Sequence, residues 1–140
     1  MTSLEKDFRA FFETYARTFH DDVGRFCDLY EFPCTTARLD GTVHRFPTKE
    51  DAVRFFTTAK ASYEAEGCRR WAVKGLVTDQ PPSGEVVATV DWDMLDGGDS
   101  PIRGWRQSYT LLRSLGGWKV RASTLLAGSE RTYRGALSDR

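Results

Sequence analysis

Two acidic residues separated by one position resemble a paired-carboxylate site in this chain of 140 residues. Asp91 and Asp93 flank Trp92, and paired carboxylates often serve as general acid and general base in catalysis. Residues 86–94, however, alternate between apolar and polar side chains, which is the pattern of a strand with one buried face. The alternation places both aspartates opposite Trp92. We therefore expect them to be solvated or to lie at a subunit contact, and not to form a catalytic pair.

Histidines and cysteines show no recognisable catalytic or metal-binding pattern. His20 and His44 stand far apart, with no carboxylate at a motif spacing from either one. The three cysteines, Cys27, Cys34 and Cys68, contain no Cys-x-x-Cys pair, so buried free thiols are the simplest interpretation. The sequence also lacks a phosphate-binding glycine loop and the Gly-x-Ser-x-Gly turn of hydrolases. We predict no metal site and no cofactor, and we name no catalytic residue.

Charge and hydropathy argue against several classes of partner. The chain carries 20 basic and 20 acidic side chains, whereas nucleic-acid-binding domains usually show a basic excess or stripe, so we expect no nucleic-acid partner. No window approaches 18 uninterrupted apolar residues, and the N-terminus offers no apolar core of a secretory signal. These features predict one domain with no membrane contact and a cytoplasmic location.

A broad aromatic face predicts a first helix from Leu4 onward, because apolar residues recur there at spacings of three and four. This face carries Phe8, Phe11, Phe12, Tyr15 and Phe19. A second, shorter helix is predicted after a cap at residues 21–22. Its apolar side would hold Val23, Phe26, Cys27 and Tyr30. It should stop before Pro33, because proline disfavours helix in the residue ahead of it.

A short hairpin is predicted next, with strand-forming residues 35–38 and 42–46 on either side of the turn Asp40-Gly41. Thr48 then starts a third helix, since an acidic residue three positions later, Asp51, completes the pattern of a capping box. This helix also has an aromatic face, which holds Ala52, Phe55, Phe56, Ala59 and Tyr63.

After Gly67, which is placed to end the third helix, the apolar period changes from 3.6 to 2. Four long strands are predicted and form an antiparallel meander: residues 70–77, 86–94, 102–114 and 118–126. In the first strand Trp71 and Val77 are an even number of positions apart, so we predict that their side chains share one face of the sheet. In the third strand we assign the inner face to Trp105, Gln107, Tyr109 and Leu111. Polar groups inside an apolar hollow would orient a ligand, and the alternative is that they contact backbone or water in a filled core.

The order of these elements resembles the NTF2-like superfamily, and from Leu4 to Leu126 the chain is similar to its SnoaL-like and ketosteroid-isomerase-like branch. The resemblance rests on the aromatic first helix through Tyr15, the Asp40-Gly41 turn before the third helix, and the final hairpin at residues 113–120. It implies an α+β fold, the cystatin-like roll, in which three helices pack over a cone-shaped, curved antiparallel sheet. It also implies a hollow beneath the helices and a homodimer through the outer sheet face.

The same resemblance aligns Tyr15 with a tyrosine that donates to a developing oxyanion in ketosteroid isomerases. The alternative is that Tyr15 is one more ring of the aromatic face. Those isomerases also need a carboxylate base on the first short strand and a protonated acid on the strand of residues 102–114. Here the first region offers only Asp40, in a turn, and the second offers no acid near Gln107. Proton transfer of the isomerase kind is therefore not expected.

The leading hypothesis is a domain, residues 1–127, that binds a small apolar molecule in the cone, followed by a polar C-terminal tail at residues 128–140. The residues predicted to contact this ligand are Tyr15, Phe12, Phe19, Phe56, Trp71, Trp92, Trp105, Gln107, Tyr109 and Trp118.

Two alternatives remain open. One is a SnoaL-like isomerase, cyclase or dehydratase acting on a polyketide- or terpenoid-like substrate, for which Tyr15, His44 and Arg38 are the reachable polar groups. The other is a non-catalytic module for dimerisation or partner binding, in which side chains of the outer sheet face pair across an interface. Those side chains are Asp91, Asp93, Arg106 and Arg121.

Overall fold

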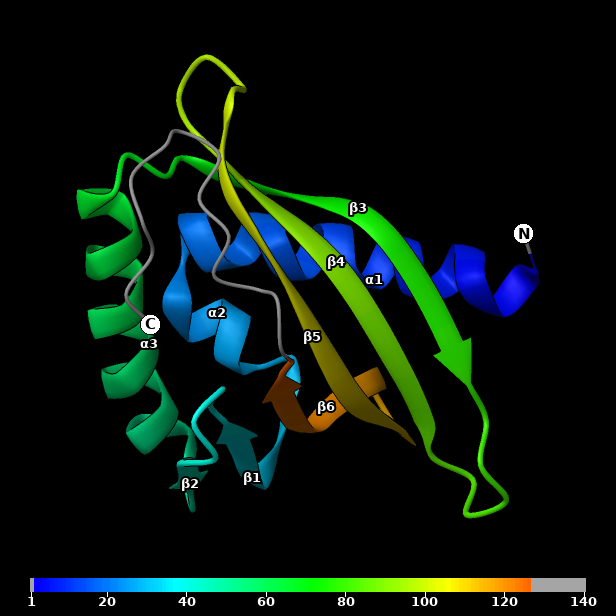
Figure 1. The fold of residues 1–140 in the computed structure, drawn as a ribbon. Coiled ribbons are helices and arrows are strands. Elements are labelled where there is room, and N and C mark those ends of the chain that lie inside the picture. Colours follow the sequence, from blue (N-terminus) through cyan, green and yellow to red (C-terminus); the bar gives the residue numbers. More distant parts are fainter. Residues whose placement is uncertain (1, 127–140) are drawn as a thin grey trace.

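The structure of the chain, a computed structural model, describes residues 2–126 (Figure 1). The helices are α1 (Ser3–Asp21), α2 (Val23–Cys27) and α3 (Lys49–Ala65). The strands are β1 (Tyr30–Ala37), β2 (Val43–Phe46), β3 (Arg70–Asp79), β4 (Val86–Leu95), β5 (Pro101–Ser114) and β6 (Gly117–Leu125). The predicted domain boundary at 127 and the predicted tail at 128–140 lie outside the described residues.

The strands form one curved, open sheet in the order β2-β1-β6-β5-β4-β3. The α+β class, with three helices over a curved sheet, is confirmed, and so is the antiparallel meander from β3 to β6. One pairing departs from the prediction, because β1 runs parallel to β6. The whole of the chain from β2 to β5 lies between these two strands, so no tight turn forces them to run in opposite directions.

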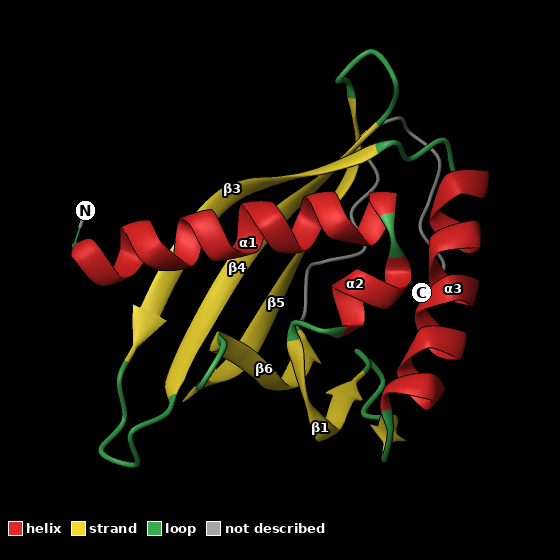
Figure 2. Ribbon diagram, turned by 180° about the vertical axis from the view of Figure 1, so that it is seen from behind, coloured by secondary structure: helices red, strands yellow, loops and turns green. Residues whose placement is uncertain are grey.

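The two long helices begin as predicted but occupy different places. Thr2 and Thr48 each close a capping box, with Glu5 and Asp51 respectively, so that free backbone N–H groups of the first turn are satisfied. Figure 2 shows α1 lying across β3, β4 and β5, whereas α3 stands at the end of the sheet near β1 and β2. The buried residues of α1 are Phe8, Phe12, Tyr15, Ala16 and Phe19, and they form the core against the sheet.

The second helix is shorter than predicted, and Tyr30 is not part of it. The helix ends at Cys27, and Tyr30 opens β1, where it pairs with Val120 of β6. The Leu29 carbonyl accepts a hydrogen bond of 2.8 Å from the Val120 amide, so pairing with the sheet replaces another helical turn. Apolar residues at positions 23, 26, 27 and 30 fit a helix, and the tertiary contact overrides that local pattern.

A bulge in β3 changes which side chains face inward. Val73 pairs with Trp92 and Gly75 pairs with Asp91, so β3 has one extra residue between these pairs. Trp71, before the bulge, is 7% exposed, whereas Val77, after it, is 67% exposed. The prediction that these two residues share a face was therefore wrong, because the extra residue inverts the alternation.

The faces predicted for β4 and β5 are confirmed. Trp105, Tyr109 and Leu111 are buried on the inner side, next to Val90, Trp92 and Met94 of β4. On the outer side Asp91 forms an ion pair with Arg106 of β5, with 2.7 Å between Oδ1 and Nε. The suspected carboxylate pair therefore lies outside the cone.

Candidate ligand-binding cavity

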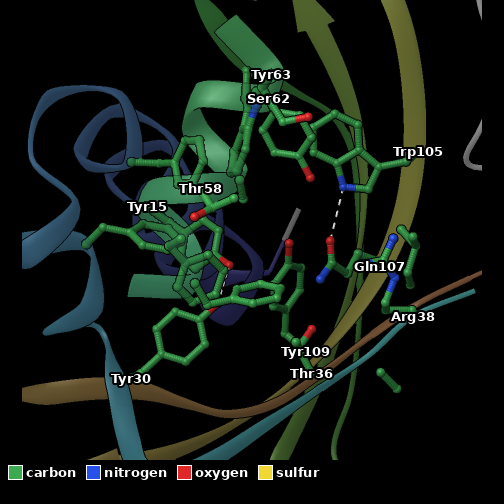
Figure 3. Close-up of a pocket in the computed structure, with 18 of the residues that line it drawn as sticks. Tyr15, Tyr30, Thr36, Arg38, Thr58, Ser62, Tyr63, Trp105, Gln107 and Tyr109 are labelled. Carbon is green, nitrogen blue, oxygen red and sulfur yellow. Dashed lines mark hydrogen bonds between the residues drawn. The ribbon is translucent and has the colours of Figure 1, made fainter. Parts of the chain in front are cut away.

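A cavity of about 560 Å³ lies between α3 and the inner face of the sheet (Figure 3). Ligand pockets in proteins usually measure about 300–1,000 Å³, so this cavity has the size of a small-molecule site. Aromatic rings make up much of its wall. They are Tyr15, Phe19, Phe26, Tyr30, Phe55, Phe56, Tyr63, Trp71, Trp105 and Tyr109.

Seven of the ten residues predicted to contact a ligand line this cavity: Tyr15, Phe19, Phe56, Trp71, Trp105, Gln107 and Tyr109. Phe12 and Trp92 lie behind this wall, fully buried, with the Phe12 ring 4.7 Å from the ring of Tyr109. Trp118 lies elsewhere, because the start of β6 is covered by the first turns of α1. Its ring packs 4.8 Å from that of Phe8.

Three tyrosine hydroxyls meet at one end of the cavity. The Tyr15 and Tyr30 oxygens are 2.6 Å apart, and the Tyr109 ring stands edge-on to that of Tyr15 with the ring centroids 5.5 Å apart. The Trp92 indole N–H donates to the Tyr109 oxygen at 2.8 Å. Burial is the main cause that raises the pKa of each tyrosine well above its usual value. All three hydroxyls therefore keep their protons at neutral pH. We call these three residues the tyrosine cluster.

The cluster holds more hydroxyl protons than its own contact uses. Each hydroxyl carries one proton, and the contact between Tyr15 and Tyr30 uses one of the three, whichever way it points. The contact with Trp92 consumes none, because an indole N–H can only donate. One phenol O–H is therefore available to an acceptor in the cavity that all three tyrosines line.

Gln107 belongs to a second polar chain along the sheet wall. Its Oε1 accepts a hydrogen bond of 3.1 Å from the Trp105 indole, shown dashed in Figure 3. Its Nε2 donates to Ser123 at 3.1 Å, and the Ser123 and Thr36 hydroxyls are 2.8 Å apart. These contacts fix the orientation of the amide, and the second N–H of Nε2 remains for another acceptor.

Three arginines contribute to the lining, and they differ in their partners. Arg103 is 5% exposed and forms a bidentate ion pair with Glu66, at 2.9 and 3.1 Å. Arg54 pairs with Asp51 on the surface of α3. Arg38, directly after β1, is exposed, and among residues 2–126 its guanidinium makes no hydrogen bond or ion pair.

No aspartate, glutamate or histidine occurs among the described residues of the lining. Its ionisable groups are tyrosines, which stay protonated, and arginines, which stay charged. His44 is not a lining residue, because its ring packs against Phe55 at 4.8 Å. Arg38 does line the cavity. A reaction that begins with proton abstraction therefore has no candidate base in the described wall.

The described part of the chain contains no reactive thiol and no group of side chains placed to bind a metal ion. The three cysteines are free and buried, as predicted, and burial raises the thiol pKa to about 11 for Cys27 and Cys68 and to about 12 for Cys34. Thiols with such pKa values are weak nucleophiles at neutral pH. Within residues 2–126 no three His, Cys, Asp or Glu side chains are grouped to hold a metal ion. None of the described helices has the length and apolar character needed to cross a membrane.

A comparison with protein-family models places this fold in a family. Residues 5–127 match the model described as NTF2-like protein (DUF6841). The chain belongs to this NTF2-like family. The resemblance inferred from the sequence is thereby confirmed. A search of curated proteins found no match.

Solved structures share the NTF2-like fold at low sequence identity. Aln2 from a Streptomyces species has a TM-score of 0.70 at 16% identity, over 90% of this chain and 93% of that chain. ActVI-ORFA from Streptomyces coelicolor has a TM-score of 0.70 at 12% identity, over 89% and 96%. An NTF2-like protein with a cystatin-like fold from Novosphingobium aromaticivorans has a TM-score of 0.65 at 14% identity, over 89% and 82%. Identities this low establish the fold alone.

Several lining residues of the NTF2-like domain were not among the predicted site residues. Tyr30 was assigned to a helix, although residues 30, 32 and 34 also alternate as a strand does. Tyr63 belongs to the aromatic face predicted for α3, and extending the site along that face would have included it. No sequence pattern indicated that Arg103 would line the cavity, because its partner Glu66 lies far from it in the sequence.

Proposed function

We propose that this NTF2-like domain binds a small, largely apolar molecule in the cavity beneath α3. The observation that carries the proposal is a cavity of about 560 Å³ with an aromatic wall and one available phenol proton. An aromatic wall favours flat, apolar ligands, and a few fixed polar groups in such a wall select and orient them.

The wall supports a ring-containing ligand with an oxygen acceptor. The rings of Tyr63 and Trp105 are stacked with centroids 6.2 Å apart, and those of Phe19 and Trp71 are stacked at 4.2 Å. A carbonyl or ether oxygen of the ligand would accept the proton of the tyrosine cluster, and such a hydrogen bond contributes about 0.5–1.5 kcal/mol. The ligand class is therefore an aromatic or polycyclic molecule with at least one acceptor oxygen.

The test is a titration with N-phenyl-1-naphthylamine, a neutral aromatic dye whose emission rises in apolar sites. Ala59, on the cavity side of α3, is changed to Trp to fill the cavity. Ala61, exposed on the same helix and outside the lining, is changed to Trp as the matched control. We expect the wild type and A61W to bind the dye, and A59W to lose at least about tenfold in affinity. Equal binding by A59W, with circular dichroism showing it folded, would contradict the proposal.

Catalysis and dimerisation gain less support from the geometry. The available phenol proton would suit an oxyanion, yet the described wall offers no base to generate one, so we propose binding and not an isomerase or cyclase activity. On the outer sheet face Arg106 pairs with Asp91 and Arg121 pairs with Glu85 within the chain. These arginines are thus already paired without a second subunit. A homodimer through that face stays a prediction, which light scattering of the purified protein measures.

A further inference from the structure

We propose that the ligand is a carboxylic acid whose carboxylate pairs with Arg38 at the mouth of the cavity, while its apolar body extends toward the tyrosine cluster. This inference rests on the proposed function and deepens it, because it assigns a charge to the ligand and a direction to its binding. It is carried by the charges of the lining, by the placement of Arg38 directly after β1, and by the size of the cavity.

One lining arginine has no salt-bridge partner among residues 2–126, although its charge acts on the exposed carboxylate of Asp40. Glu66 neutralises Arg103, and Asp51 neutralises Arg54. Arg38 has neither a salt bridge nor a side-chain hydrogen bond within residues 2–126, and the described wall contains no acid that would repel an anion. A ligand with a single negative charge balances this site, and a planar carboxylate matches the two parallel N–H groups of a guanidinium.

The end of β1 brings Arg38 close to a second hydrogen-bond donor, the side-chain amide of Gln107. Thr36 and Arg38 are two residues apart, which puts their side chains on the same face of an extended chain, and both line the cavity. Thr36 contacts Ser123, which in turn accepts from the Gln107 amide. The free N–H of Gln107 therefore lies near the same end of β1 as Arg38. Figure 3 shows both residues on one side of the cavity, with Tyr15 and Tyr30 on the other.

The size of the cavity, together with the register of β1 against β6, limits the apolar part of the ligand. Tyr30 pairs with Val120 and Ala37 pairs with Thr124, so the two ends of β1 are separated by four residues of β6. At about 3.3 Å per residue the backbones of Tyr30 and Ala37 are about 13 Å apart, while Tyr109 of the tyrosine cluster pairs with Ser123, which also pairs with Thr36. A cavity of about 560 Å³ has room for two or three fused rings that carry a carboxylate at the arginine end.

The test compares two probes of the same shape and different charge, 2-naphthoate and the neutral 2-naphthamide, as competitors of N-phenyl-1-naphthylamine. We expect the wild type to bind 2-naphthoate at least about tenfold more tightly than 2-naphthamide. In Arg38→Gln this ratio should fall to about one. Arg38→Lys, which keeps the charge and loses the fork of donors, should retain an intermediate ratio.

Arg45→Gln is the matched control, because it removes a positive charge from the exposed surface of the neighbouring strand β2, outside the lining. It should keep the wild-type ratio. Equal binding of the two probes by the wild type, or an unchanged ratio in R38Q, would overturn the carboxylate assignment while leaving the cavity as a binding site. Absence of dye binding to the wild type would instead remove the proposed function itself, so the two failures are distinguishable.

Discussion

The helices α1 and α3 have similar sequence patterns and different tasks. They contain 19 and 17 residues, both begin with a capping box, and both carry an aromatic face. The α1 helix buries five residues against the sheet, whereas α3 buries Ala52 alone. Phe55, Phe56 and Tyr63 of α3 are half-buried, because they face the cavity and not a packed layer of side chains. The same periodic pattern thus builds a core in one helix and a cavity wall in the other.

The largest effect that separates the two helices is expected from truncating one aromatic ring in each. Phe12 of α1 is fully buried among the rings of Tyr15, Trp92 and Tyr109, so Phe12→Ala should lower the free energy of unfolding by about 3–5 kcal/mol. Phe56→Ala in α3 should cost less than half as much, since its ring already borders empty space. Urea denaturation of both variants measures the difference. Equal losses would mean that α3 is packed as tightly as α1.

A buried ion pair at the end of α3 should give the next largest effect. Glu66, the C-terminal cap of α3, holds the guanidinium of Arg103, which is 5% exposed. Glu66→Gln should cost about 3 kcal/mol, at the lower end of the range for breaking a buried pair, because the Glu66 side chain is 29% exposed. Glu13→Gln in α1 breaks an exposed pair with Arg9 and should cost at most about 1 kcal/mol. Equal unfolding free energies of E66Q and E13Q would contradict the assignment.

A pH-dependent loss of stability is expected where α1 meets α3. His20 lies in the last turn of α1, and burial, followed by the charge of Lys60 on α3, lowers its pKa from 6.5 to about 4, although Glu64 and Asp21 act in the opposite sense. The unfolded chain takes up this proton near pH 6.5 and the folded chain only near pH 4, so stability falls as the pH drops between these values. His20→Gln should reduce the slope of unfolding free energy against pH in this window. An unchanged slope would show that His20 is not its source.

The smallest effect concerns the start of α3. Because few of its residues are buried, its first turn depends strongly on the Thr48 cap, and Thr48→Ala should cost about 1 kcal/mol and speed amide hydrogen exchange there. Thr57→Ala, at an exposed position within the same helix, serves as control and should be neutral or slightly stabilising. Unchanged exchange in T48A would indicate that tertiary contacts and not the cap hold this turn.

Local sequence patterns predicted the helices and strands of the domain more completely than the residues that line its cavity. The capping box at Thr48 and the alternation along β4 depend on neighbours in the sequence, so they could be recognised before the structure was known. The extra residue in β3, the parallel pairing of β1 with β6 and the contact between Arg103 and Glu66 depend on distant parts of the chain. Those distant contacts decide which tyrosines and arginines reach the cavity. These distant contacts explain why the prediction of the site omitted Tyr30 and Arg103.

A crystal structure of the protein grown with a saturating concentration of N-phenyl-1-naphthylamine would test whether the space beneath α3 is a binding site. We predict density for the naphthalene ring inside the cavity, in contact with Phe56 of α3 and Trp105 of β5. Density for water alone in the cavity, or for the dye elsewhere on the surface with the cavity unoccupied, would contradict the proposed function.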